Sequence, residues 1–182
     1  MKLNLPNKLT LLRVILIPLC MFFIVYPVFG KIASPIIAAV LFILTSLTDM
    51  LDGKIARKYN LVTDFGKFMD PLADKLLVYS AFCIFVEIKF VPAWMFIIIL
   101  AREFAVAGIR TVAASTGKVI AAGITGKIKT VLQMICVLCL IMSCVVHDPF
   151  YIAGQGFLWG SLVMTVVSGT EYIVKNIDVF KS

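Results

Sequence analysis

The chain has 182 residues, of which 62% are hydrophobic and only 15% are charged, and its formal net charge is +7. Its mean hydropathy is +1.05. A soluble domain of this length must keep a largely polar surface and cannot bury so much apolar side chain, so the composition excludes a soluble globular protein. We expect an all-α membrane protein, with membrane lipids and no nucleic acid among its partners.

A membrane-spanning helix needs about 20 mainly apolar residues. The sequence offers six such stretches, which in chain order are residues 11–29, 33–52, 70–88, 92–112, 130–147 and 152–174. The fourth carries Arg102 and Glu103, charges that are costly inside a membrane. The first follows Lys2, Lys8 and Arg13, as the core of a signal peptide would, but no small-residue cleavage site follows it. We therefore interpret all six as transmembrane helices of the mature protein.

Positive charge alternates from loop to loop. Lys31 and Lys89 are the single cations between spans one and two and between spans three and four, and there is none between spans five and six. Apart from Arg102, the remaining cations fall on the opposite side: Lys2, Lys8, Arg13, Lys54, Arg57, Lys58, Lys67, Lys75, Arg110, Lys118, Lys127, Lys129, Lys175 and Lys181. Cytoplasmic loops are enriched in Lys and Arg. The sequence thus predicts that both termini and the acidic residues described next face the cytoplasm.

Half of the acidic residues, five of ten, lie between positions 49 and 74. Asp49 and Asp52 are three residues apart, and Asp70 and Asp74 are four apart, so each pair occupies one face of a helix. We expect residues 60–67 to form a turn, with Pro71 in the first turn of the following helix. The two pairs would then face each other at the cytoplasmic edge of the membrane, where the active site is expected.

Four carboxylates in an otherwise apolar chain indicate a metal site. Hard oxygen ligands suit Mg²⁺ or Mn²⁺, and two ions about 4 Å apart that hold a phosphoryl group would use all four acids. The alternative is a solvated loop with surface ion pairs to Lys54, Lys58 and Lys67. That alternative does not explain the helical spacing of the acids.

Small residues and one arginine stand among the acids. Gly53 allows a ligand to approach the helix backbone, and Ala56 is the next small residue along the helix. Arg57 can bind a phosphate through two parallel hydrogen bonds. Gly66 stands one turn before Asp70, where it leaves space for a base or a sugar.

The frame Asp-x2-Asp-Gly-x2-Ala-Arg-x8-Gly-x3-Asp-x3-Asp resembles the signature of the CDP-alcohol phosphatidyltransferases at every fixed position. The resemblance covers the whole chain and implies one transmembrane domain of this family over residues 1–182. It implies that an acceptor hydroxyl attacks the β-phosphorus of a CDP-linked lipid and that CMP leaves. It further implies two divalent cations held by Asp49, Asp52, Asp70 and Asp74, with Asp74 as general base. The CDP-lipid would be bound by Asp52, Gly53, Ala56, Arg57 and Gly66.

Further cations follow toward the C-terminus. Arg102, Glu103 and Arg110 lie within about two helical turns on nearly one face. We predict that Arg110 and Lys127 bind a phosphate on the acceptor, and that Arg102 pairs with Glu103 or another acid. The segments Ala101–Phe104, Val119–Ala122 and Gly126–Thr130, like the opening Asn4–Arg13, resemble the bacterial phosphatidylglycerophosphate synthases. That resemblance implies CDP-diacylglycerol as donor and sn-glycerol 3-phosphate as acceptor.

Other functions stay open at this point. A sister transferase would use inositol phosphate, serine or phosphatidylglycerol as acceptor, and a metal-ion transporter would use the aspartates as its ion path. A transporter, however, would place carboxylates near the middle of the bilayer on several helices. The small residues of Gly156-x-x-x-Gly160 favour close helix packing, within one chain or between two. The family resemblance implies a homodimer with one site in each subunit.

Overall fold

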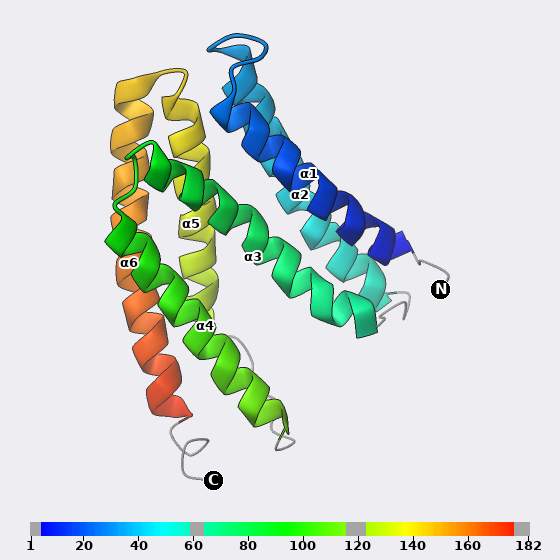
Figure 1. Cartoon of the computed structure of the whole chain (residues 1–182). Helices are drawn as coiled ribbons and strands as arrows, with labels where there is room; N and C mark the ends of the chain where they lie inside the picture. Colours follow the sequence, from blue (N-terminus) through cyan, green and yellow to red (C-terminus); the bar gives the residue numbers. More distant parts are fainter. Residues whose placement is uncertain (1–4, 59–63, 116–122, 177–182) are drawn as a thin grey trace.

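The structure is a computed structural model that describes residues 5–58, 64–115 and 123–176, without the side chains of residues 5–9, 49–58, 64–71, 74 and 115. Within these ranges it contains six helices and no strand (Figure 1). The helices are α1 (Leu5–Val25), α2 (Ala33–Lys58), α3 (Asp64–Glu87), α4 (Ala93–Ser115), α5 (Ile124–Ser143) and α6 (His147–Lys175). The prediction of an all-helical protein is confirmed for this part of the chain.

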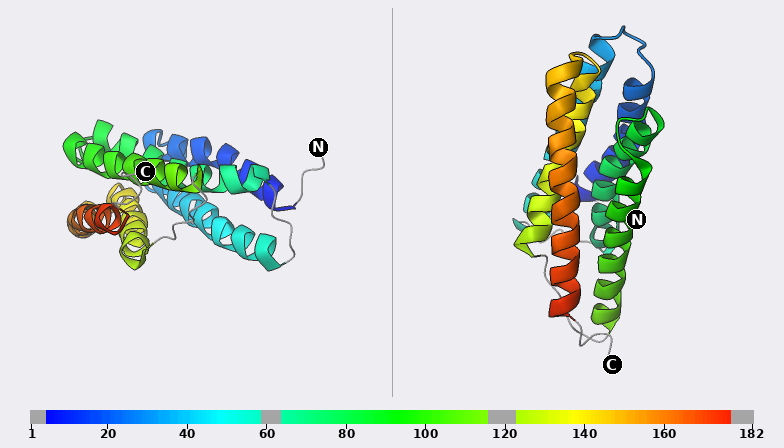
Figure 2. Two further views of the ribbon diagram at one scale, coloured as in Figure 1. Left: turned by 90° about the horizontal axis from the view of Figure 1, so that it is seen from below. Right: turned by 90° about the vertical axis from the view of Figure 1, so that its left-hand side faces the viewer.

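The helices run alternately up and down (Figure 1). The N-terminal ends of α1, α3 and α5 and the C-terminal ends of α2, α4 and α6 point toward what we call the lower end. The most extensive contacts are between α5 and α6 and between α1 and α2. α4 packs against α6, and the two views of Figure 2 show the pair running side by side. The described helix ends that flank the cation-rich connections of the sequence therefore belong to the lower end.

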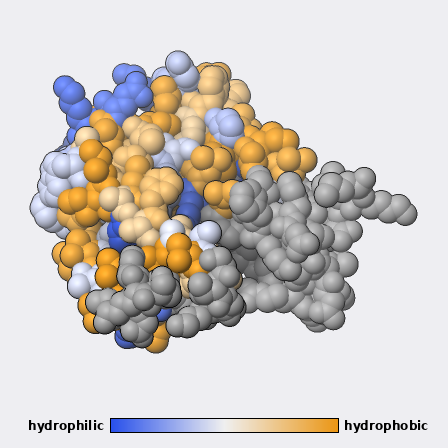
Figure 3. Space-filling view, turned by 60° about the horizontal axis from the view of Figure 1, so that its bottom comes forward, coloured by the Kyte–Doolittle hydropathy of each residue, from blue (hydrophilic) through white to orange (hydrophobic). Residues whose placement is uncertain are grey.

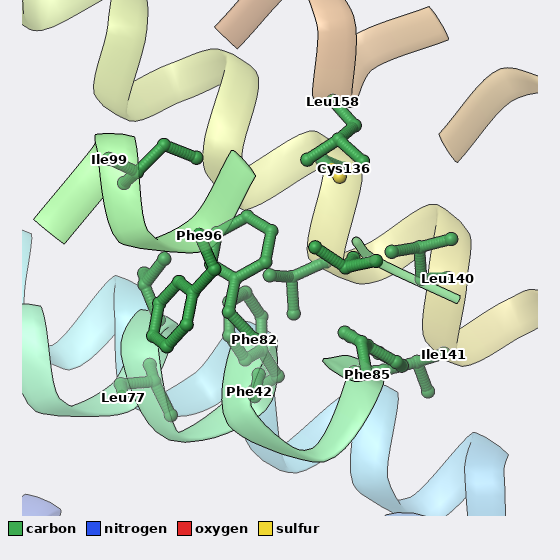
Figure 4. Packing of buried hydrophobic residues seen from close by; sticks show 14 of the residues in the cluster. Phe42, Leu77, Phe82, Phe85, Phe96, Ile99, Cys136, Leu140, Ile141 and Leu158 are labelled. Atoms are coloured by element: carbon green, nitrogen blue, oxygen red, sulfur yellow. The ribbon is translucent and has the colours of Figure 1, made fainter. Parts of the chain in front are cut away.

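One apolar core joins all six helices. Its buried members include Ile17, Phe42, Phe82, Phe96, Leu140 and Leu158. Aromatic rings from α2, α3 and α4 meet aliphatic side chains of α5 and α6 in this core (Figure 4). Because each helix contributes to a single core, the relative positions of α3, α4, α5 and α6 are set by packing.

The outer surface is also apolar. Large hydrophobic side chains are exposed on every helix, for example Leu19, Ile43, Leu76, Ile97, Val131 and Ile152. Hydrophobic residues also cover much of the described surface when the lower end is turned forward (Figure 3). Among the described residues, two helices are long and apolar enough to cross a membrane, Ile124–Ser143 and His147–Lys175. An apolar exterior of this kind suits a lipid environment.

Several predicted boundaries are wrong. α1 ends at Val25, four residues before the predicted end of the first span, near Pro27, whose fixed φ and missing N–H disfavour continuation. α5 ends at Ser143 and α6 begins at His147, so the predicted fifth span, residues 130–147, ends too late and the predicted sixth span, residues 152–174, begins too late. α3 begins at Asp64, so Pro71 lies inside the helix and not in its first turn. An acidic residue at position 64 favours a helix N-terminus there, because it complements the helix dipole.

A glycine of α6 allows close approach to α5, but it is not one of the two predicted, Gly156 and Gly160. A Cβ atom on Gly154 would lie 2.7 Å from Cδ2 and 3.0 Å from Cγ of the fully buried Leu140 in α5. A Cβ on Gly156 would meet no atom within 4 Å, and one on Gly160 would only touch Leu132 at 3.8 Å. The close contact between α5 and α6 therefore depends on Gly154.

We expect Gly154→Ala to lower the free energy of unfolding by about 1–3 kcal/mol relative to Gly156→Ala, because the added methyl overpacks a filled core. Both substitutions gain the same helix propensity, so Gly156→Ala is the matched control. Thermal unfolding of the two variants in the same detergent micelle measures the difference. Equal midpoints for the two variants would show that Leu140 moves aside freely.

Candidate functional site

The residues of the aspartate motif occupy two consecutive helices. Asp49, Asp52, Gly53, Ala56 and Arg57 lie in the C-terminal part of α2, and Gly66, Asp70 and Asp74 lie in the N-terminal part of α3. Both parts belong to the lower end of the molecule, with α2 in contact with α3 (Figure 1). The predicted hairpin is thus present at the level of the helices. The side chains of these eight residues lie outside the described part of the structure.

The donor set is suitable for divalent cations. Asp49 with Asp52 and Asp70 with Asp74 keep their three- and four-residue spacing on continuous helices, so each pair shares a helix face. Carboxylate oxygens are the ligands that Mg²⁺ and Mn²⁺ prefer. Among the residues whose side chains are described, there is no group of three or more metal-ligating side chains. The aspartate motif therefore stays the candidate place for such ions.

A cavity of about 1100 Å³ opens beside the motif, between α4, α5 and α6, and reaches Lys75 of α3. Six cationic side chains line it: Lys75, Arg102, Arg110, Lys127, Lys129 and Lys175. Two carboxylates, Glu103 and Glu171, also line it, which leaves four positive charges in excess among its described residues. A cavity with this charge attracts anions. Arg110 and Lys127, predicted from sequence as a pair, both lie in its wall.

Glu103 joins three cations from three helices at the inner part of the cavity. Arg102 Nη1 donates to Glu103 Oε1 at 2.7 Å, and Lys129 Nζ donates to the same oxygen. Lys75 Nζ lies 3.4 Å from Glu103 Oε2. Only 8% of Glu103 and 3% of Lys129 are exposed. The predicted pairing of Arg102 with Glu103 is confirmed, and the cluster connects α3, α4 and α5.

Two glycines make room for Arg102. A Cβ atom on Gly169 of α6 would lie 2.9 Å from Arg102 Cγ, and one on Gly126 of α5 would lie 3.8 Å from Arg102 Nη2. Arg102 Nε is buried without a hydrogen-bond partner, as is Nε2 of Gln133. A buried donor without a partner is costly. Arg102 therefore keeps one unused hydrogen-bond donor, Nε, close to the cavity.

Arg110 is oriented by α6. Its Nε donates to Tyr172 Oη at 3.2 Å, and its guanidinium carbon lies 5.4 Å from the centroid of the same ring. Tyr172 is itself buried, where it packs with Val106 and Ile109. The ring and the hydroxyl together hold the guanidinium in one orientation at the cavity wall.

Glu171 forms a second polar group at the outer part of the cavity. Its Oε2 accepts a hydrogen bond from Thr125 Oγ1 at 2.7 Å, and its Oε1 accepts one from Lys175 Nζ at 2.5 Å. Thr125 belongs to α5, so this contact joins the lower ends of α5 and α6. It keeps the rim of the cavity in place beside Lys127.

The contribution of α6 to the cavity was not predicted from the sequence. Three residues of α6 line the cavity, namely Glu171, Tyr172 and Lys175, and Gly169 faces Arg102. None of the four belongs to a recognised motif. The spacing of the lining residues in α6 is a usable signal. Positions 168, 171, 172 and 175 recur at three- and four-residue intervals, so they share one helix face. Lys118 and the segment 119–122, also noted in the sequence, lie outside the described residues.

Comparison with known proteins identifies a family for most of the chain. A family model described as CDP-alcohol phosphatidyltransferase matches residues 3–167. This range contains the complete aspartate motif as well as Arg110 and Lys127.

Individual relatives are similar over nearly their full length. A Bacillus subtilis protein named CDP-diacylglycerol–glycerol-3-phosphate 3-phosphatidyltransferase is 47% identical over 98% of this chain and 98% of its own length. A protein of the same name from Rickettsia bellii is 38% identical over 93% of each chain. A Mycobacterium tuberculosis protein named as a probable phosphatidylglycerophosphate synthase is 32% identical over 94% of this chain and 81% of its own.

Proposed function

Because this chain belongs to the CDP-alcohol phosphatidyltransferase family, we propose that it transfers the phosphatidyl group of CDP-diacylglycerol to sn-glycerol 3-phosphate and releases CMP. The acceptor is supported by the cavity between α4, α5 and α6, in which six cations face two carboxylates. A phosphate monoester carries close to two negative charges and several strong acceptor oxygens, so it complements such a cavity. Serine, with no net charge, would leave most of these cations unused.

The acceptor phosphate is held by Arg110 and Lys127. Arg110 presents a guanidinium that Tyr172 holds in place, which suits the planar geometry of bidentate phosphate binding. Lys127 is exposed in the opposite wall, on α5, where a flexible ammonium can follow the phosphate as it enters. The acceptor hydroxyl then points toward α3 and its aspartates.

Asp49, Asp52, Asp70 and Asp74 hold two divalent cations, Mg²⁺ or Mn²⁺, at the facing ends of α2 and α3. The ions, when bound, neutralise the diphosphate of the donor and stabilise the charge that develops on the leaving phosphate. Asp52, Gly53, Ala56, Arg57 and Gly66 bind the CDP part of the donor.

The chain's own residues then orient the two substrates and deprotonate the acceptor hydroxyl. Asp74 accepts the proton of the acceptor hydroxyl while the oxygen of that hydroxyl bonds to the β-phosphorus. The bond from that phosphorus to the bridging oxygen breaks, and CMP leaves with the electron pair. Most of the rate acceleration comes from holding the two substrates in line.

The setting of this chemistry is a bacterial cytoplasmic membrane. We propose that residues 1–182 form a single transmembrane domain with six spans and cytoplasmic termini, which is supported by the alternation of positive charge along the sequence and by the up-and-down order of the six described helices (Figure 1). The active site then faces the cytoplasm, where a soluble phosphorylated acceptor is available. The assembly is a homodimer in which each subunit carries its own site.

The proposed reaction is tested by measuring CMP release from CDP-diacylglycerol by the purified protein with a panel of acceptors. Glycerol 3-phosphate is expected to support release, whereas serine, inositol phosphate and phosphatidylglycerol are not. Release with another acceptor alone would move the chain to a sister specificity. Metal uptake into sealed vesicles without any CMP release would instead identify a transporter.

The acceptor site gives a separate prediction. Arg110→Ala or Lys127→Ala should raise the KM for glycerol 3-phosphate about ten- to a hundredfold, because a charge-assisted contact of about 1.5–3 kcal/mol is lost. The KM for CDP-diacylglycerol should change little. Tyr172→Phe keeps the ring under Arg110 but removes its hydroxyl, so it should raise the acceptor KM by only a few-fold, in the range of one neutral hydrogen bond of about 1 kcal/mol. Equal changes in the KM of both substrates would place these residues in the donor site or in folding.

A further inference from the structure

A single carboxylate lies between the aspartate motif and the acceptor cavity. Glu103 contacts Lys75 of α3, Arg102 of α4 and Lys129 of α5, and it is 8% exposed. We call these four residues the inner cluster. Its three cations exceed its one acid by two charges. Lys75 directly follows Asp74, so the inner cluster borders the place where the general base is proposed.

The cations proposed to hold the acceptor phosphate lie farther out. Arg110 stands seven residues after Glu103 on α4, which is about 10 Å along the helix. Lys127 is exposed, whereas Lys129, two residues later, is almost fully buried. The cavity therefore has an outer pair, Arg110 and Lys127, and an inner cluster, and both are positive.

A phosphorylated acceptor could bind such a cavity in two orientations. With its phosphate on the outer pair, its free hydroxyl reaches toward α3; with its phosphate on the inner cluster, the hydroxyl points away from the donor. Charges attract more strongly where water is excluded, so three buried cations without a counter-charge would favour the second orientation. Glu103 opposes this, because it accepts hydrogen bonds from Arg102 and Lys129 and cancels one of the three charges.

We propose that Glu103 is a positioning residue that makes acceptor binding productive. By pairing with the inner cations it leaves the phosphate to Arg110 and Lys127 and keeps the inner end free for the hydroxyl. This inference rests on the proposed function, because it concerns the orientation of that acceptor in that cavity. It assigns Glu103 a kinetic effect that a purely structural ion pair does not have.

The test is the acceptor dependence of CMP release by Glu103→Gln at saturating CDP-diacylglycerol. Unproductive binding lowers kcat and KM by the same factor and leaves kcat/KM unchanged. We expect kcat and the KM for glycerol 3-phosphate each to fall about tenfold. This factor corresponds to about 1.4 kcal/mol of added affinity for the unproductive orientation. Inorganic phosphate, a probe of the anion site alone, should inhibit this variant at lower concentrations than it inhibits the wild type.

Three further variants sharpen the result. Glu103→Gln combined with Lys129→Gln removes one inner cation and should bring kcat and KM back toward the wild-type values. Glu87→Gln removes an exposed acid at the other end of α3 and should change neither parameter. Lys75→Gln should leave the acceptor KM within about twofold, since its half-exposed contact with Glu103 is weak and the phosphate does not bind there. A large rise in the acceptor KM of Lys75→Gln would contradict the inference even should Glu103→Gln fail to fold.

Three results would overturn the inference: a raised acceptor KM in Glu103→Gln, a lower kcat with unchanged KM, or a large rise in KM in Lys75→Gln. The first would make Glu103 part of the binding site, the second would make it a structural residue, and the third would put the phosphate on the inner cluster. Failure of the proposed function is separate, because the wild-type protein would then release no CMP on addition of glycerol 3-phosphate.

Discussion

Asp49→Asn, Asp52→Asn and Asp70→Asn are each expected to lower the rate of CMP release about a thousandfold or more while the protein still folds and inserts. Each substitution keeps the size of the side chain but removes a negative charge that a divalent cation needs, and several kcal/mol of transition-state stabilisation are lost with the ion. Insertion is not harmed, because a neutral amide is less costly than a carboxylate near a membrane.

Asp64→Asn is the matched control for these variants. Asp64 is the acid that begins α3, in the same hairpin, but it lies outside the spaced aspartate pairs. It should keep close to wild-type activity. The measurement is CMP release at the Mg²⁺ concentration that just saturates the wild type, with folding checked by size-exclusion chromatography in detergent. Near wild-type turnover by any of the three motif variants would contradict the two-metal proposal.

Asp74→Asn is expected to be inactive in a way that added metal does not correct. If Asp74 accepts the proton of the acceptor hydroxyl, an amide in its place cannot do so at any Mg²⁺ or Mn²⁺ concentration. Binding of CDP-diacylglycerol should be largely kept, because Asp49, Asp52 and Asp70 still hold at least one ion. Asp74 lies one turn farther along α3 than Asp70, next to Lys75 of the inner cluster, where the acceptor hydroxyl is proposed to arrive.

Metal titrations against Asp74→Asn, with binding of the CDP-lipid measured in parallel, separate the two possibilities. Asp70→Asn run under the same conditions is the comparison, since a lost ligand weakens metal affinity and is corrected in part by mass action. Substantial recovery of the Asp74→Asn rate at high Mg²⁺ or Mn²⁺ would leave Asp74 as a fourth ligand and require another base.

Local geometry explains why the two helices that carry the aspartate motif could be predicted. A spacing of three or four residues places two side chains on one helix face wherever the helix lies. The pairing of Asp49 with Asp52 and of Asp70 with Asp74 on a shared face therefore requires only that α2 and α3 form. Arg102 and Glu103 were also expected to pair, and they do. The boundary of α3 was misjudged because Pro71 was taken as a start signal, while the helix begins earlier, at Asp64.

The sequence by itself determined the apolar helical class, the alternation of charged connections and the spacing of the aspartates, because composition and helical period are properties of neighbouring residues. Only the tertiary structure decided that Lys75 and Lys129 share Glu103, that Tyr172 orients Arg110, and that Gly154 is the point of close packing. The polar contacts join residues far apart in the sequence: Lys129 and Glu103 are 26 positions apart, and Arg110 and Tyr172 are 62 positions apart. In a chain that is apolar both inside and outside, hydrophobic periodicity does not tell which face of a helix turns inward. The rotation of each helix, and with it the choice of polar partners, follows from how the side chains of all six helices fill one core.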